Sequence, residues 1–153
     1  MRIQDIMTQD VHSVGPADSL QVAAQLMWDH DCGAVPVVGG EGTVIGMVTD
    51  RDICMASLTQ GRILTEIPVY LAMSHEAFTC YDDDSVEAAE SIMREKQVRR
   101  LPVIDELGQL VGVLSLNDLA RRGRNLWSRS RGLRPSAVAQ TLAAVCAPHA
   151  VTH

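Results

Sequence analysis

The spacing of apolar residues predicts a mixed order of strands and helices in the first 60 residues. Leu20, Ala23, Ala24 and Met27 recur at helical spacing. The next apolar residues form two continuous runs typical of buried strands. A glycine-rich turn separates these runs and predicts a hairpin. The predicted elements are a strand at 11–14, a helix at 17–31 capped by Asp18 or Ser19, strands at 33–38 and 43–49, and a helix that begins at Thr49.

The chain repeats itself when it is shifted by 66 positions. Pro36 then falls on Pro102, Gly46 on Gly112, and no gap is needed. Identities in register over some 50 residues indicate a duplicated unit. Each copy is too small to bury both faces of its sheet, so we expect the two copies to pack on each other. The second copy has predicted strands at 77–80, 99–105 and 110–115, a helix at 83–97 and a helix that begins near Ser115; the expected domains are residues 1–60, residues 61–122 and a basic linker with a short apolar helix at 123–153.

Composition places the chain among small α/β or α+β proteins. Of its 153 residues 46% are hydrophobic but only 3% aromatic, so Val, Leu, Ile, Ala and Met must form the core. No apolar run approaches the roughly 20 residues needed to cross a bilayer, and the N-terminus lacks the apolar segment of a signal peptide. A soluble cytoplasmic protein with no membrane contact is therefore expected. The four cysteines are scattered without a CxxC pair, which favours reduced thiols.

Charge is distributed unevenly along the chain. Residues 1–120 hold all 19 acidic residues, whereas residues 121–153 hold six arginines and no acidic residue. The Arg-rich segment 121–134 includes Trp127 and could bind nucleic acid. A basic linker that folds against the acidic body is the preferred interpretation, so nucleic acid is not expected as a partner. The apolar helix predicted at 137–146 would be costly to leave in water, so we expect it to dock on a neighbour.

Three further motifs predict no chemistry of their own. The glycine-rich stretch 40–46 lies between two strands, whereas a phosphate-binding loop leads from a strand into a helix. The CAPH stretch at 146–149 has two potential zinc ligands where about four are needed. The acidic YDDDS stretch at 81–85 fits a helix N-terminus better than a calcium site. We therefore expect no metal site, and no nucleophile–base pair predicts catalysis.

The sequences GMVTDRDI (46–53) and GVLSLNDL (112–119) allow two interpretations. A Thr or Ser followed by an acid three residues later is close to a capping box. The same pattern, doubled after an apolar-Pro-Val strand, resembles a tandem pair of cystathionine-β-synthase (CBS) domains over residues 1 to about 122. The closing helix and its Cys-x-Pro ending are similar to those of small stand-alone bacterial CBS-pair proteins of the hypoxic-response type.

The resemblance implies a fold, a ligand class and a set of site residues. It implies two β-α-β-β-α units packed as a pseudo-twofold disc, with a C-terminal helix and clefts for an adenosine-containing ligand. That ligand would be AMP, ADP, ATP, NAD or S-adenosylmethionine, acting as a regulatory ligand rather than a required cofactor, and a homodimer is expected. By this resemblance Asp52 and Asp118 would hold the ribose, and Thr49 and Ser115 would face the phosphates. The same phosphate region would be lined, less strictly, by Asp50, Arg51, Leu116 and Asn117. The adenine would be held by Cys32, Gly33, Ala34, Val98, Arg99 and Arg100, and the pockets would be completed by the segments Thr8 to Val11 and Ser74 to Ala77.

Physical chemistry supports these roles. A carboxylate accepts two hydrogen bonds from a vicinal diol, and a helix N-terminus attracts a phosphate through its unpaired N–H groups. Arg99 and Arg100 replace Gly33 and Ala34 of the first copy, so the two clefts should differ in occupancy. The sequence predicts a regulatory or sensor module; the alternatives are a structural dimeric stress protein with vestigial clefts, or nucleic-acid binding through the Arg-rich segment.

Overall fold

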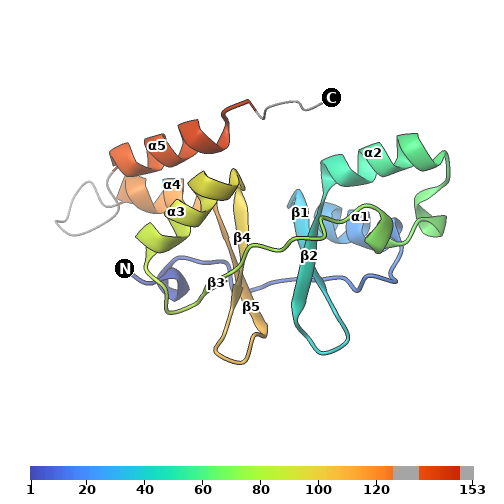
Figure 1. The fold of residues 1–153 in the computed structure, drawn as a ribbon, viewed down its shortest axis with the longest axis horizontal. Helices are drawn as coiled ribbons and strands as arrows, with labels where there is room; N and C mark the ends of the chain where they lie inside the picture. The colour runs from blue at the N-terminus through green and yellow to red at the C-terminus, as the bar shows by residue number, and fades with distance from the viewer. Residues whose placement is uncertain (126–134, 149–153) are drawn as a thin grey trace. The chain divides into compact units, whose positions relative to one another are not determined.

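The computed structural model describes residues 1–125 and 135–148 (Figure 1). It confirms a mixed α/β fold with two repeated units and a C-terminal helix. None of the helices among the described residues is long and apolar enough to cross a membrane. Trp127 of the Arg-rich segment and His149 of the CAPH stretch lie outside the described residues. The elements are α1 (Leu20–Asp29), β1 (Ala34–Val38), β2 (Val44–Thr49), α2 (Asp50–Gln60), β3 (Cys80–Tyr81), α3 (Val86–Lys96), β4 (Arg100–Ile104), β5 (Leu110–Ser115), α4 (Leu116–Asn125), α5 (Pro135–Val145) and 3₁₀ turns at Ile3–Asp5, Leu64–Glu66 and Val69–Leu71.

The hairpins form where the sequence predicts them. Strands β1 and β2 pair antiparallel with Val35 opposite Val48, and the middle three residues of β1 are buried. Gly42 and Gly108 occupy equivalent turn positions with φ of 79° and 77°, a backbone region that glycine adopts without steric cost. In the other sheet β4 lies between β3 and β5. Each hairpin leads directly into a helix, which fixes where the helix N-terminus lies.

The predicted strand at 11–14 is wrong, since only Val14 pairs with β1. Val14 donates to the Pro36 carbonyl, and Val38 donates to the Val14 carbonyl at 2.8 Å. Extending this parallel ladder toward residue 12 would require an N–H from Pro36, which has none. Pro102 occupies the same place in β4, and β3 is accordingly confined to two residues at the end of the predicted 77–80 strand. The repeated proline thus ends both ladders.

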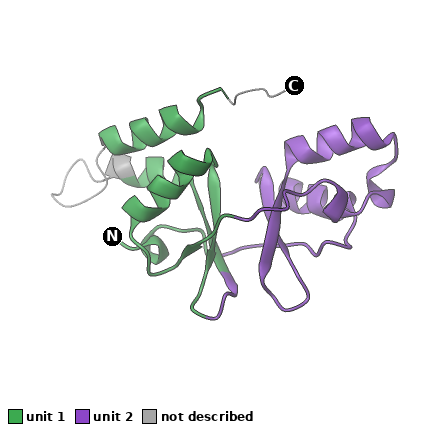
Figure 2. Cartoon of the chain, in the orientation of Figure 1, with its two compact units in different colours: residues 1–9, 78–106, 111–153 green, residues 10–77, 107–110 purple. Residues whose placement is uncertain are grey.

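The chain folds into two compact units, and their boundaries do not follow those of the sequence repeat (Figure 2). Unit 1 consists of residues 1–9, 78–106 and 111–153, and unit 2 of residues 10–77 and 107–110. The segment that begins the first copy therefore belongs to the compact unit built from the second, where Thr8 pairs with Val113. In the same way Ser74, near the start of the second copy, pairs with Met47 in unit 2.

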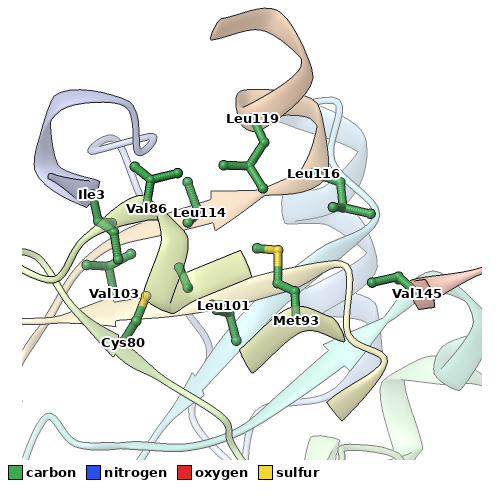
Figure 3. Close-up of a cluster of buried hydrophobic side chains, with 11 residues drawn as sticks. Ile3, Cys80, Val86, Met93, Leu101, Val103, Leu114, Leu116, Leu119 and Val145 are labelled. Atoms are coloured by element: carbon green, nitrogen blue, oxygen red, sulfur yellow. The ribbon is translucent and has the colours of Figure 1, made fainter. Parts of the chain in front are cut away.

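Each unit has its own hydrophobic core. In unit 1 the buried side chains come from the sheet, from α3 and α4, and from Val145 of α5 (Figure 3). In unit 2 the core is formed by α1, α2, the hairpin and the turn residues Ile67 and Val69. Of the four apolar positions predicted for α1, Leu20, Ala23 and Met27 are buried, and Ala24 is partly buried against the same core. Aliphatic side chains therefore fill both cores, as the low aromatic content requires.

Helix α5 packs within its own chain, against α3 and α4 (Figure 1). Its Thr141 is fully buried and its Val145 is 3% exposed. Arg94 of α3 donates to the Thr141 hydroxyl at 3.0 Å, and Gln97 donates to the Ala144 carbonyl at 3.2 Å. The helix was expected to dock on a neighbour; within the chain, unit 1 covers Thr141 and Val145, whereas Leu142 is 50% exposed.

Candidate functional site

A capping box begins α2 in unit 2. Asp52 Oδ2 accepts the backbone N–H of Thr49 at 2.9 Å, and Thr49 Oγ1 accepts that of Asp52 at 3.1 Å. The two residues thus satisfy N–H groups that the helix would otherwise leave unpaired. Asp52 Oδ1 is not used in this box. The capping interpretation is therefore correct for this motif, and it leaves one carboxylate oxygen for another partner.

The same box begins α4 in unit 1. Asp118 Oδ2 accepts the Ser115 N–H at 2.8 Å and the Ser115 hydroxyl at 2.6 Å. Its other oxygen, Oδ1, lies 3.8 Å from the Arg121 guanidinium. The Asp118 side chain is only 9% exposed, so a ligand hydroxyl would have to reach it at Oδ1 beside Arg121. Of the two carboxylates, Asp118 is the more strongly held by its own unit.

The residues before each buried strand lie at the helix N-terminus that follows it. Asp50 donates its N–H to the Gly33 carbonyl at 3.1 Å, and Leu116 donates to the Arg99 carbonyl at 3.0 Å. These equivalent bonds hold the predicted adenine segment beside the predicted phosphate segment in each unit. The structure therefore brings together two of the three groups of candidate residues within each unit.

A cavity of about 290 Å³ lies at this place in unit 1. Five of the residues with an implied role line it, and Leu142 of α5 and Cys146 just after this helix line the rest. Sequence reasoning missed the α5 residues, because an apolar helix carries no signal of which surface it covers. The lining residues are Arg99, Arg100, Ser115, Leu116, Asn117, Leu142 and Cys146.

Unit 2 has a larger cavity, of about 530 Å³, between α1 and α2. Only Cys32 and Asp50 of the predicted residues line it. Trp28 is 84% exposed there, and neither it nor Asp31 was predicted as a site residue. The lining residues are Ala24, Met27, Trp28, Asp31, Cys32, Asp50 and Ile53.

The repeat explains why the two cavities differ in size. The positions of Trp28 and Asp31 correspond to Arg94 and Gln97 in the second copy, which hold α5 through hydrogen bonds. Helix α5 therefore fills in unit 1 the groove that stays open in unit 2. A helix with no counterpart in the first copy narrows one cavity and leaves the other wide.

The remaining candidates do not line either cavity. Thr8 belongs to unit 1, where it exchanges two 3.0 Å backbone hydrogen bonds with Val113. Ser74 belongs to unit 2, where its hydroxyl accepts the Met47 N–H at 3.1 Å. These contacts hold the Thr8 segment against β5 and the Ser74 segment against β2. Neither cavity is lined by Val11, Gly33, Ala34, Thr49, Arg51, Asp52, Ser74, Ala77, Val98, Thr8 or Asp118.

Two titratable groups are perturbed by burial away from the helix N-termini. Burial, with a smaller effect of Asp84, raises the pKa of the Cys80 thiol to about 12. Burial also raises the pKa of the Glu90 carboxyl, although the Thr141 hydroxyl and Arg94 act in the opposite direction. Across residues 1–125 and 135–148, no three His, Cys, Asp or Glu side chains are grouped so that they could hold a metal ion.

The sequence and fold match known proteins over most of the chain. The family model described as CBS domain matches residues 3–59 and 65–125. CBS domain-containing protein YhcV of Bacillus subtilis is 42% identical over 118 residues, which cover 77% of this chain and 82% of that protein. Hypoxic response protein 1 of Mycobacterium tuberculosis is 34% identical over 148 residues, which cover 97% of this chain and 96% of that protein.

Solved structures share the fold. The crystal structure of Hypoxic Response Protein I with two coordinated zinc ions is 36% identical, with a TM-score of 0.71 over 79% of this chain and 98% of that one. The crystal structure of CBSX2 in complex with AMP is 27% identical, with a TM-score of 0.70 over 84% of this chain and 98% of that one. The two matched segments and the full-length relative together show that this chain belongs to the CBS domain family, as a tandem CBS pair.

Proposed function

We propose that this CBS pair is a non-catalytic regulatory module that binds an adenosine-containing ligand beside its helix N-termini. The observation that carries the proposal occurs in both units. In each, a helix with an aspartate in its first turn is joined at its start, by a hydrogen bond of 3.0–3.1 Å, to the segment before a buried strand. A CBS-pair relative of the same fold was solved with AMP. The ligand would be AMP, ADP, ATP, NAD or S-adenosylmethionine, and its effect would pass to a homodimer or a partner.

Within this proposal each group of residues has a chemical role. Asp52 and Asp118 would accept hydrogen bonds from the ribose hydroxyls through Oδ1, because Oδ2 belongs to the capping box. The first turns of α2 and α4 would face the phosphates, because a helix N-terminus carries a partial positive charge. The adenine would lie along the segments 32–34 and 98–100, and the segments 8–11 and 74–77 would complete the pockets.

Ligand-dependent stability tests this proposal. A ligand that binds only the folded chain at 100 times its Kd adds about 2.7 kcal/mol to the free energy of unfolding. We expect at least one of AMP, ADP, ATP, NAD and S-adenosylmethionine to raise the melting temperature at millimolar concentration. If none of them does, the chain is better described as a structural protein whose clefts are vestigial.

Carboxamide variants separate ligand binding from capping. The change Asp52→Asn or Asp118→Asn keeps an oxygen that can accept the N–H of Thr49 or Ser115, so the cap persists while the carboxylate charge is lost. We expect such a variant to unfold within about 1 kcal/mol of the wild type but to lose its response to the ligand. A variant that keeps the full response would show that its aspartate serves the cap alone.

A further inference from the structure

The unit 1 cavity contains two guanidinium groups without a counter-charge. Arg99 is exposed and Arg100 is half-buried, and both line the cavity. Among the described residues neither forms an ion pair, and no acidic side chain lines the cavity. Two unpaired cations facing one small space create a positive potential that only an anionic ligand would neutralise.

Neighbouring polar groups in this cavity suit a phosphate. Ser115 and Asn117 lie at the start of α4, where the first backbone N–H groups have no partner within the helix. A phosphate there would meet both the helix N-terminus and the fork of an arginine, which binds oxyanions in a bidentate manner. Leu116 and Leu142 provide apolar surface for the rest of the ligand.

The cavity of unit 2 has the opposite charge. Asp31 and Asp50 line it, no cationic side chain does, and neither carboxylate forms an ion pair with a described residue. The positions equivalent to Arg99 and Arg100 are Gly33 and Ala34. Arg51 of the first turn of α2 does not line this cavity, so a phosphate in it would meet two carboxylates and no guanidinium, and charge repulsion disfavours its binding.

We propose that the two units sort ligands by charge, so that a phosphate-bearing adenosine ligand binds in unit 1 and is excluded from unit 2. This inference rests on the proposed function and assigns Arg99 and Arg100 as its specificity-determining residues. A cavity of about 290 Å³ is at the lower limit of small-molecule sites, which begin near 300 Å³, so it suits a mononucleotide better than a dinucleotide. Each chain therefore binds one AMP.

Calorimetric titration of the full chain with AMP, and separately with adenosine, tests the inference. The wild type should bind one AMP per chain and prefer AMP to adenosine by about tenfold or more, since hydrogen bonds to charged groups are worth roughly 1.5–3 kcal/mol. The double variant Arg99→Gln/Arg100→Gln should lose this preference while keeping its affinity for adenosine, because the adenine would contact the backbone of segment 98–100 and not the two guanidinium groups. The control Lys96→Gln/Arg122→Gln removes the same charge from unit 1 outside the cavity and should keep it.

The possible outcomes separate this inference from the proposed function. Three outcomes would overturn the charge sorting and leave ligand binding intact. They are two AMP molecules bound per chain, equal affinities of the wild type for AMP and adenosine, and an unchanged preference for AMP in the arginine variant. Absence of binding by AMP, adenosine and S-adenosylmethionine would overturn both. Because Arg100 begins β4, the single variant Arg99→Gln provides a second test on an exposed side chain, with a smaller loss of preference expected.

Discussion

Replacement of Gly46 by alanine tests the crossing of the Ser74 segment over β2. A Cβ atom at residue 46 would overlap the Ser74 carbonyl oxygen, which is a backbone atom and cannot rotate away. The segment is held there by two hydrogen bonds, from the Ser74 N–H to the Met47 carbonyl at 2.8 Å and from the Met47 N–H to the Ser74 hydroxyl at 3.1 Å. The added methyl group must either strain this contact or break it.

The expected cost follows from these two routes. Inserting a methyl group into a packed contact costs about 1–3 kcal/mol. Displacing the segment instead loses two hydrogen bonds of about 0.5–1.5 kcal/mol each, which is a similar amount. Alanine also restricts the unfolded chain and so returns about 0.4–1 kcal/mol. We expect Gly46→Ala to lower the free energy of unfolding by about 1–2 kcal/mol, which corresponds to a fall in Tm of roughly 2–8 °C.

Urea and thermal unfolding followed by circular dichroism measure this effect. The matched control is Gly40→Ala in the turn of the same hairpin, where a Cβ atom would meet nothing within 4 Å. That variant should be as stable as the wild type or slightly more stable, because only the unfolded state is affected. Equal unfolding midpoints for the two variants would refute the crossing and, with it, the placement of Ser74 in unit 2.

Three further predictions concern buried polar groups in unit 1. Thr141→Val should lower the free energy of unfolding by about 1–3 kcal/mol in urea titrations, because it removes the hydroxyl partner of the buried Glu90 carboxyl and the half-buried Arg94 guanidinium. An unchanged free energy of unfolding would contradict the docking of α5. Because the pKa of Glu90 is raised in the folded chain, folding favours the protonated carboxyl, and the free energy of unfolding should fall as the pH rises from about 4.5 through the raised pKa. Glu90→Gln should flatten this dependence in unfolding curves measured between about pH 4 and 8. With a pKa of about 12 and almost no exposure, Cys80 should resist alkylation by iodoacetamide at pH 8 in the native chain, as mass spectrometry would show, while three exposed cysteines react: Cys32, Cys54 and Cys146.

Local patterns in the sequence were sufficient to predict most of the elements. Apolar runs bounded by glycine turns predicted both hairpins, and the Thr49 and Ser115 motifs predicted the helix starts and their caps. These features depend on residues close in the chain, so composition and spacing carry the information. The predicted strand at 11–14 failed because its pairing depends on Pro36, a residue 22 positions after Val14 that cannot donate a hydrogen bond.

Long-range pairing could not be predicted in the same way. Because the copies are so similar, the segment that contains Thr8 has two equivalent candidate partners in the sequence, Met47 and Val113, and only the fold selects Val113. The contribution of α5 to the unit 1 cavity could not be predicted either, since the apolar face of this helix does not show which surface it packs against. The opposite charges of the cavities could be predicted only in part. The sequence places Arg99 and Arg100 opposite Gly33 and Ala34 of the first copy, but only the structure shows that Asp31 and Trp28 line the unit 2 cavity.

The central claim is that an adenosine-containing ligand binds beside a helix N-terminus of this CBS pair. A crystal structure of the chain grown with AMP at saturating concentration tests it most directly. We expect AMP in unit 1, with its phosphate beside Arg99 and Ser115 and its ribose hydroxyls within hydrogen-bond distance of Asp118. Empty helix N-termini at saturating AMP, or AMP bound away from Ser115 and Asp118, would contradict it.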